Sequence, residues 1–75
     1  MINKEQFTFV YKTNIQNEND HFKIKNILGA HQLVEEWSVD TEDKDCVLRV
    51  VSDKISEQEI KETIHRIGFQ CTELI

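Results

Sequence analysis

The densest group of side chains that could bind a metal ion is Asn17-Glu18-Asn19-Asp20, followed directly by His21. Zinc accepts carboxylate and imidazole ligands, but it needs about three or four of them at one point. Neighbouring residues of a helix point about 100° apart, so Asp20 and His21 cannot easily share one ion. Calcium needs six to eight oxygen ligands and a turn glycine, which this segment does not supply. A weak divalent-ion site at Glu18 and Asp20 is one hypothesis for the segment.

A purely structural role is the other hypothesis for the same residues. Asn17 is a preferred N-cap, and Asp20 stands three residues later, where the capping box has Glu or Gln. Glu18 and Asp20 also place negative charge in the first turn of a helix, where the helix dipole favours it. On this interpretation the helix start satisfies its own backbone donors and binds no metal.

The remaining reactive side chains form no catalytic or redox motif. Cys46 and Cys71 are far apart in the sequence, and we interpret them as two buried thiols in a reducing compartment. Glu62 and His65 have the spacing of a di-iron motif, but such a site requires a second pair and further glutamates. The sequence offers no Ser-His-Asp, Cys-His or paired-carboxylate arrangement. We therefore expect neither an enzyme nor a resident cofactor.

Length and composition predict one small domain. A chain of 75 residues can supply a single hydrophobic core, so residues 1–75 are treated as one domain. The formal net charge of −5 argues against binding to nucleic acid and to anionic lipid, which both attract basic surfaces. No apolar run approaches the ~18 residues of a membrane span, and the features of a signal peptide are absent. We expect a cytoplasmic protein without membrane insertion.

Hydrophobic periodicity predicts four strands. Apolar residues at alternate positions from Phe7 to Ile15 indicate the first strand, and residues 34–41 and 46–52 indicate the second and third. The polar residues 42–45 between them predict a hairpin turn. A short fourth strand is expected after Phe69.

Two helices are predicted between these strands. Asn17 caps the first helix, which ends near Gly29, and a capping box from Ser56 to Glu59 opens the second, which ends at Gly68. Their apolar stripes consist of Ile24, Ile27, Leu28, Ile60, Ile64 and Ile67.

The element order βαββαβ predicts an α+β, ferredoxin-like fold. Right-handed crossovers give an antiparallel four-stranded sheet in the order 4-1-3-2 with both helices on one face. Cys46 on the third strand and Cys71 on the fourth would then have the first strand between them. Their separation of roughly 9–10 Å is too large for a disulfide.

This topology brings the first loop, the hairpin turn and the Gly68-Phe69 connection to one end of the sheet. That end is rich in carboxylates, and we interpret it as a candidate docking surface for a basic protein partner. A merely solvated acidic surface is the alternative. The residues assigned to the candidate docking surface are Glu18, Asp20, Asp43, Asp45 and Phe69.

From about Phe9 to Leu74 the chain resembles heavy-metal-associated domains, the family that includes copper chaperones. The family pattern has a strand, a Met-x-Cys-x-x-Cys loop, a helix with an aliphatic residue four positions after the second cysteine, and a Val-x-Val strand. A Gly-aromatic pair follows the second helix. The matching positions here are Ile24, Leu28, Trp37-Ser38-Val39-Asp40, Val50, Asp53 and Gly68-Phe69.

The same alignment places Ile15 at the family's methionine, and Asn17 and Asp20 at its two cysteines. The resemblance therefore implies the family's fold with a degenerate metal loop, because an amide and a carboxylate replace the two thiolates that hold copper(I) in the family. Both replacements bind this soft ion poorly. We predict a non-enzymatic protein-binding or regulatory module that has lost thiolate metal transfer. The alternative is a protein that binds or delivers a metal ion through oxygen and nitrogen ligands around Asp20.

Overall fold

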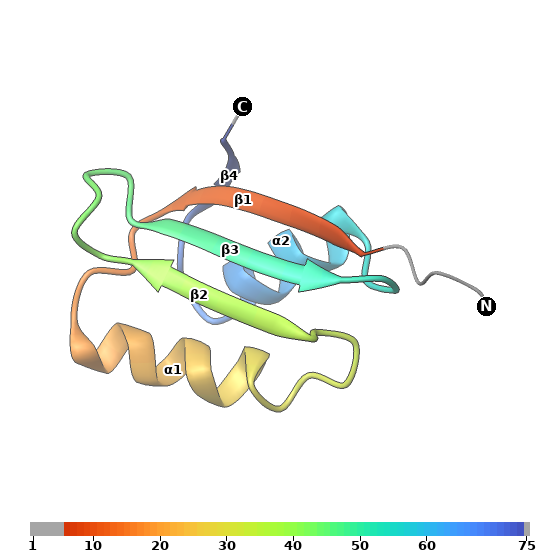
Figure 1. Cartoon of the computed structure of the whole chain (residues 1–75). Helices are drawn as coiled ribbons and strands as arrows, with labels where there is room; N and C mark the ends of the chain where they lie inside the picture. The colour runs from red at the N-terminus through yellow and green to blue at the C-terminus, as the bar shows by residue number, and fades with distance from the viewer. Residues whose placement is uncertain (1–5, 75) are drawn as a thin grey trace.

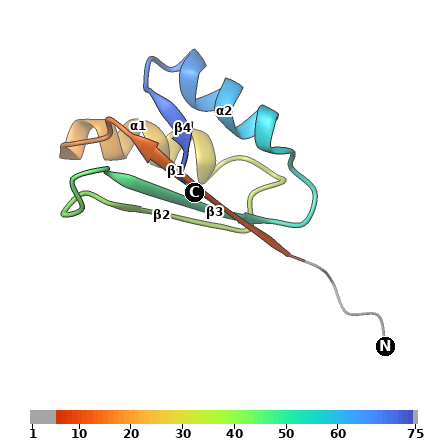
Figure 2. The ribbon, with the colours of Figure 1, turned by 90° about the horizontal axis from the view of Figure 1, so that it is seen from above.

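The computed structural model describes residues 6–74, over which the chain forms four strands and two helices in the predicted order (Figure 1). These elements are β1 (Phe7–Thr13), α1 (Glu18–Leu28), β2 (Glu36–Asp40), β3 (Val47–Ser52), α2 (Glu57–Arg66) and β4 (Cys71–Glu73). The sheet has the order β2-β3-β1-β4 with all neighbours antiparallel. Both helices cover the same face of the sheet (Figure 2). The predicted α+β, ferredoxin-like fold is confirmed.

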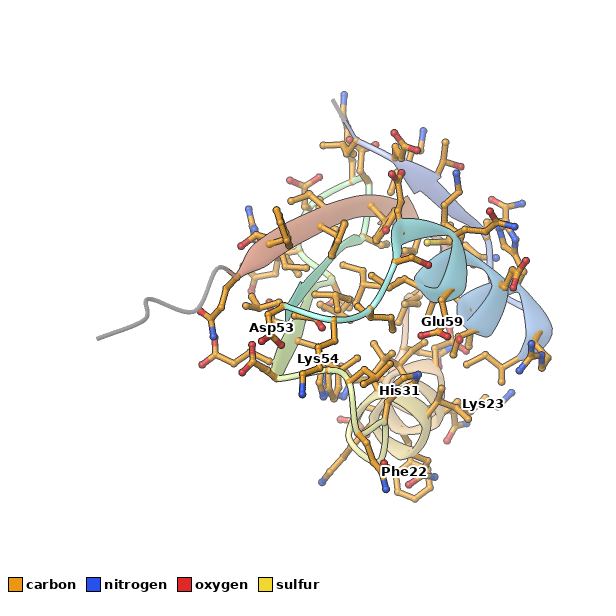
Figure 3. The ribbon with its side chains drawn as sticks, turned by 90° about the vertical axis from the view of Figure 1, so that its right-hand side faces the viewer. Phe22, Lys23, His31, Asp53, Lys54 and Glu59 are labelled. Carbon is orange, nitrogen blue, oxygen red and sulfur yellow. The ribbon has the colours of Figure 1, made fainter. Side chains whose placement is uncertain are left out.

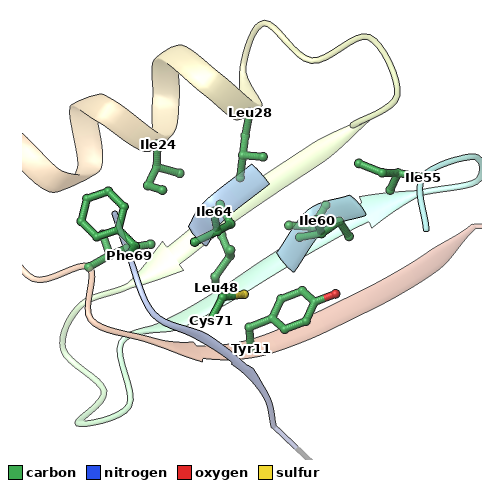
Figure 4. Close-up of a cluster of buried hydrophobic side chains, with 11 residues drawn as sticks. Tyr11, Ile24, Leu28, Leu48, Ile55, Ile60, Ile64, Phe69 and Cys71 are labelled. Carbon is green, nitrogen blue, oxygen red and sulfur yellow. The ribbon is translucent and has the colours of Figure 1, made fainter. Parts of the chain in front are cut away.

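The core lies between the two helices and the covered face of the sheet (Figure 4). Leu48 of β3 is opposite Tyr11 of β1 on one side and Val39 of β2 on the other. This row of side chains crosses the sheet, and the apolar stripes of α1 and α2 pack onto it. The largest fully buried hydrophobic side chains are Tyr11, Ile15, Ile24, Leu28, Leu48, Val50, Ile60 and Ile64.

Three strand boundaries differ from the sequence prediction. β1 ends at Thr13, although Ile15 remains fully buried in the loop that follows. β2 is shorter than the predicted range 34–41. The placement of Cys46 on the third strand is wrong, because Cys46 has a φ of +45°, which lies outside the extended region.

Thr13 connects β1 to the hairpin turn beyond the last paired residues. Its N–H donates to the Asp45 carbonyl at 3.0 Å, and its hydroxyl donates to the Cys46 carbonyl at 2.6 Å. The turn between β2 and β3 is thereby fixed against the end of β1.

Gly68 ends α2 in a Schellman motif. Its φ of +95° lies in the left-handed region that favours glycine. The Gly68 N–H donates to the His65 carbonyl at 2.9 Å, and the Phe69 N–H donates to the Ile64 carbonyl at 3.2 Å. This turn directs Phe69 inward, where it joins Ile64 in the core.

The two cysteines should remain reduced and react slowly. Both are free and buried, and Thr13 contacts Cys46 while lying opposite Cys71 in the sheet. Burial raises the pKa of the Cys71 thiol to about 11, which leaves little thiolate at neutral pH. We expect Cys71 to be alkylated about 100-fold more slowly in native than in urea-unfolded protein. Mass spectrometry of the native protein that found a Cys46–Cys71 disulfide would contradict the strand order.

Candidate metal loop and docking surface

Asn17 and Asp20 form the cap at the start of α1. The Asn17 side-chain oxygen Oδ1 accepts a hydrogen bond from the Asp20 N–H at 2.9 Å. Asp20 Oδ2 accepts in turn from the Gln16 N–H at 3.1 Å. In a standard capping box, the side chain of the third helical residue accepts from the N–H of the cap residue itself. Asp20 accepts instead from the N–H of Gln16, the residue before the cap. One oxygen of each side chain is therefore used to hold the backbone at the helix start.

The neighbouring side chains do not converge on Asp20. The ring of His21 packs against that of Trp37 on β2, with the ring centroids 5.3 Å apart. Glu18 is exposed on the first turn of α1. Within residues 6–74, no three His, Cys, Asp or Glu side chains lie close enough together to hold a metal ion. The geometry of this loop is that of a helix cap.

Ile15 and Phe69 lie beneath the loop, in the core. Ile15 is fully buried, and Phe69 is only 9% exposed because the Schellman turn points it inward. The prediction that Phe69 belongs to the candidate docking surface is wrong, because its side chain is buried in the core. The candidate docking surface therefore consists of its carboxylates and does not include Phe69.

Three connections meet at the end of the sheet that carries this loop. The Gln70 N–H donates to Asn14 Oδ1 at 2.8 Å, which joins the α2–β4 connection to the β1–α1 loop. The hydrogen bonds of Thr13 join the β2–β3 hairpin to the same end. Figure 1 shows the hairpin turn and the β1–α1 loop together at the left-hand end. The acidic residues in the first turn of α1 and in the hairpin are here called the acidic end: Glu18, Asp20, Glu42, Asp43 and Asp45.

The carboxylates of the hairpin also shape its backbone. Asp40 Oδ1 accepts from the N–H groups of Glu42 and Asp43, at 3.1 and 3.3 Å. Asp43 Oδ1 accepts from the Asp45 N–H at 2.9 Å, and Asp45 pairs with Lys12 at 3.7 Å. Such Asx turns explain how this hairpin forms without an Asn-Gly pair. This role of Asp40 was not predicted, although an aspartate at the end of a strand is a turn signal.

A groove of about 670 Å³ lies beside the acidic end, between α1 and the end of β2. Phe22 projects from α1 beside this groove and is 60% exposed (Figure 3). Phe22 was not among the predicted site residues, and it lies off the buried stripe of Ile24 and Leu28. The residues that line the groove are Gln16, Asn17, Glu18, His21, Phe22, Lys25, Val39 and Thr41.

A scan against known protein families gives no match, and no curated protein matches the sequence. Among solved structures, the chain is similar to the crystal structure of oxidized MerP from Ralstonia metallidurans CH34, with a TM-score of 0.80. The two sequences are 15% identical, and the alignment covers 95% of this chain and 100% of that chain. At this identity the likeness concerns the fold alone, which is the ferredoxin-like fold shared with MerP.

Proposed function

We propose that the chain is a non-enzymatic protein-binding or regulatory module of the heavy-metal-associated type, with a degenerate metal loop at Asn17–Asp20. The observation that carries this proposal is the cap of α1. Oxygens of Asn17 and Asp20 are already bonded to backbone N–H groups, and no thiolate is present at either position. The MerP-like fold is consistent with a scaffold of this type.

The two thiols of the chain are poorly placed to replace the missing ligands. Cys46 is 7% exposed at the hairpin, and Cys71 is 3% exposed at the start of β4. Copper(I) needs thiolates that it can reach, and burial raises the pKa of the Cys71 thiol to about 11. Two buried, reduced cysteines also fit a reducing compartment, which supports a cytoplasmic location. Across the described residues, neither helix is long and apolar enough to cross a membrane.

We further propose that the acidic end docks a basic protein surface. Five carboxylates gather at this end, where hydrogen bonds join the connections. Lys12 pairs with Asp45 and Lys44 lies in the same hairpin, so the acidic end keeps an excess of negative charge. The net charge of −5 adds a long-range attraction for a basic partner. Electrostatic steering of this kind raises the association rate more than it slows dissociation.

The double change Asp20→Asn, Asp43→Asn tests this docking surface. Asparagine keeps the oxygens that accept from Gln16 and Asp45, so charge is lost while the cap and the turn remain. We expect the association rate with a partner captured from native lysate to fall about threefold to tenfold at low salt. Its salt dependence should also become weaker. Surface plasmon resonance at low and high salt measures both quantities.

The matched control removes two carboxylates elsewhere. Glu36→Gln, Glu62→Gln gives the same net charge, but Glu36 lies at the far end of β2 and Glu62 is exposed on α2. If wild type, test variant and control associate equally fast, the acidic end is a solvated surface without a docking role.

A further inference from the structure

A second cluster of ionisable groups lies at the other side of the molecule, where the start of α2 meets β1 and β4. Glu57 is the first residue of α2, and Glu73 of β4 lies opposite Tyr11 of β1 in the sheet. A cavity of about 190 Å³ opens between these elements. It is lined by Thr8, Phe9, Val10, Tyr11, Glu57, Glu73 and Leu74, none of which belongs to the acidic end.

Two buried polar atoms beside this cavity lack a partner within the described part of the chain: the Tyr11 hydroxyl and Glu57 Oε1. Tyr11 is only 1% exposed, and Figure 4 shows its hydroxyl directed away from Cys71. A buried polar atom left without a hydrogen bond costs about 1–3 kcal/mol. The hydroxyl requires an acceptor, and the carboxylate oxygen requires a donor or a cation. A polar guest in the cavity would satisfy both atoms.

Glu57 and Glu73 both line the cavity, and interaction with the Glu73 carboxyl raises the pKa of the Glu57 carboxyl. Two ionised carboxylates that share one small cavity repel each other, so a positive charge between them is favourable. A proton or a metal ion can supply that charge. Lys61 pairs with Glu73 at 3.4 Å and competes for the same carboxylate.

We propose that Glu57, Glu73 and Tyr11 form a binding site for a hydrated hard divalent cation of the Mg²⁺ and Mn²⁺ class. Such ions keep several waters and bind proteins through one or two carboxylates, which matches the two present here. A water of the ion donates to the Tyr11 hydroxyl oxygen, and a further water in the cavity accepts the hydroxyl proton. The cavity has room for the ion and a few waters, each of which occupies about 30 Å³. Zinc fits less well, because it requires more converging protein ligands.

The consequence of binding is a link between α2 and the edge of the sheet. β4 has three residues, and its end is held to β1 by the hydrogen bond from the Leu74 N–H to the Val10 carbonyl at 3.0 Å. An ion bound by both Glu57 and Glu73 would link β4 to α2. The site is independent of the proposed docking function, since it uses other residues on another edge.

Titration of Mn²⁺ into the full-length chain, followed by amide NMR, tests the proposal. This ion broadens the signals of nearby amides, so it locates the site even when binding is weak. We expect the signals of Tyr11, Glu57, Glu73 and Leu74 to broaden first. Glu57→Gln and Glu73→Gln should each raise the Mn²⁺ concentration that gives the same broadening by about tenfold. Lys61→Gln, which removes the competing charge, should lower it about threefold.

The control is Asp20→Asn, which should leave this broadening unchanged because Asp20 lies in the acidic end. Broadening that begins at the acidic end overturns the proposal, as does broadening near Tyr11 that neither glutamine variant reduces. Absence of broadening near Tyr11 also overturns it and leaves a proton and water as the only guests. If Glu73→Gln disturbs β4 in the metal-free spectrum, Glu57→Gln on the helix decides the outcome.

Discussion

Changing Asn17 and Asp20 together to cysteine should create a tight copper(I) site. The two positions are the cap and the third residue of α1, and the Asn17 side chain already folds over the Asp20 backbone at 2.9 Å. Two thiolates at this spacing supply the soft ligands that copper(I) prefers. We expect copper(I) affinity to rise at least about a thousandfold over wild type, roughly 4 kcal/mol. Loss of the Asn17 cap should cost about 1 kcal/mol, which bound metal offsets.

Competition with a coloured copper(I) chelator measures this affinity. The matched control is Asn17→Ser, Asp20→Ser, which retains a good capping residue at position 17 and replaces each thiol by a hydroxyl. This control should behave like wild type. A cysteine variant that folds but competes no better than the serine variant would show that the loop does not occupy the family's metal position.

The second large effect concerns the centre of the core. Leu48→Ala should lower the free energy of unfolding by about 3 kcal/mol, because it leaves a cavity beneath both helices. Leu48 is 0% exposed and lies between Tyr11 and Val39 in the sheet. A domain of this size has a total stability of roughly 5–10 kcal/mol, so about a third or more of it would be lost. Urea unfolding followed by Trp37 fluorescence provides the measurement.

Arg49→Ala is the control for this substitution. Arg49 is the next residue of β3 and lies on the exposed face of the sheet. Its replacement should change stability by no more than about 0.5 kcal/mol. Equal losses from the two variants would mean that the helices do not cover the Leu48 face.

The helix ends could be predicted from the sequence because their signals are local. Asn17 and Ser56 both accept a backbone N–H three residues later, at 2.9 and 3.1 Å, as the cap patterns indicate. Gly68 ends α2 with a positive φ, which a glycine after an apolar stripe predicts. In place of the reciprocal bond expected from Glu59, its carboxylate lies 3.9 Å from the ring of His31, which belongs to the loop after α1 (Figure 3). The contact between Glu59 and His31 depends on tertiary packing, so the cap motif in the sequence does not predict it.

The features missed by the sequence analysis depend on contacts between distant segments. Cys46 leaves the strand because Thr13 of β1 bonds to its carbonyl, and Phe69 is buried because the Schellman turn points it at the helices. Glu57 and Glu73 share a cavity because the register of β4 on β1 places Glu73 opposite Tyr11. Periodicity gives the face on which a residue lies, but not the neighbour that it meets there.

Copper(I) competition on wild-type protein with reduced cysteines tests the central claim most directly, namely that Asn17–Asp20 is a helix cap and no longer a metal site. The account predicts that the protein is folded without metal and withdraws no copper(I) from a strong chelator. The amide NMR signals of residues 16–21 should stay unchanged during the titration. Tight copper(I) binding that shifts these signals would contradict the account.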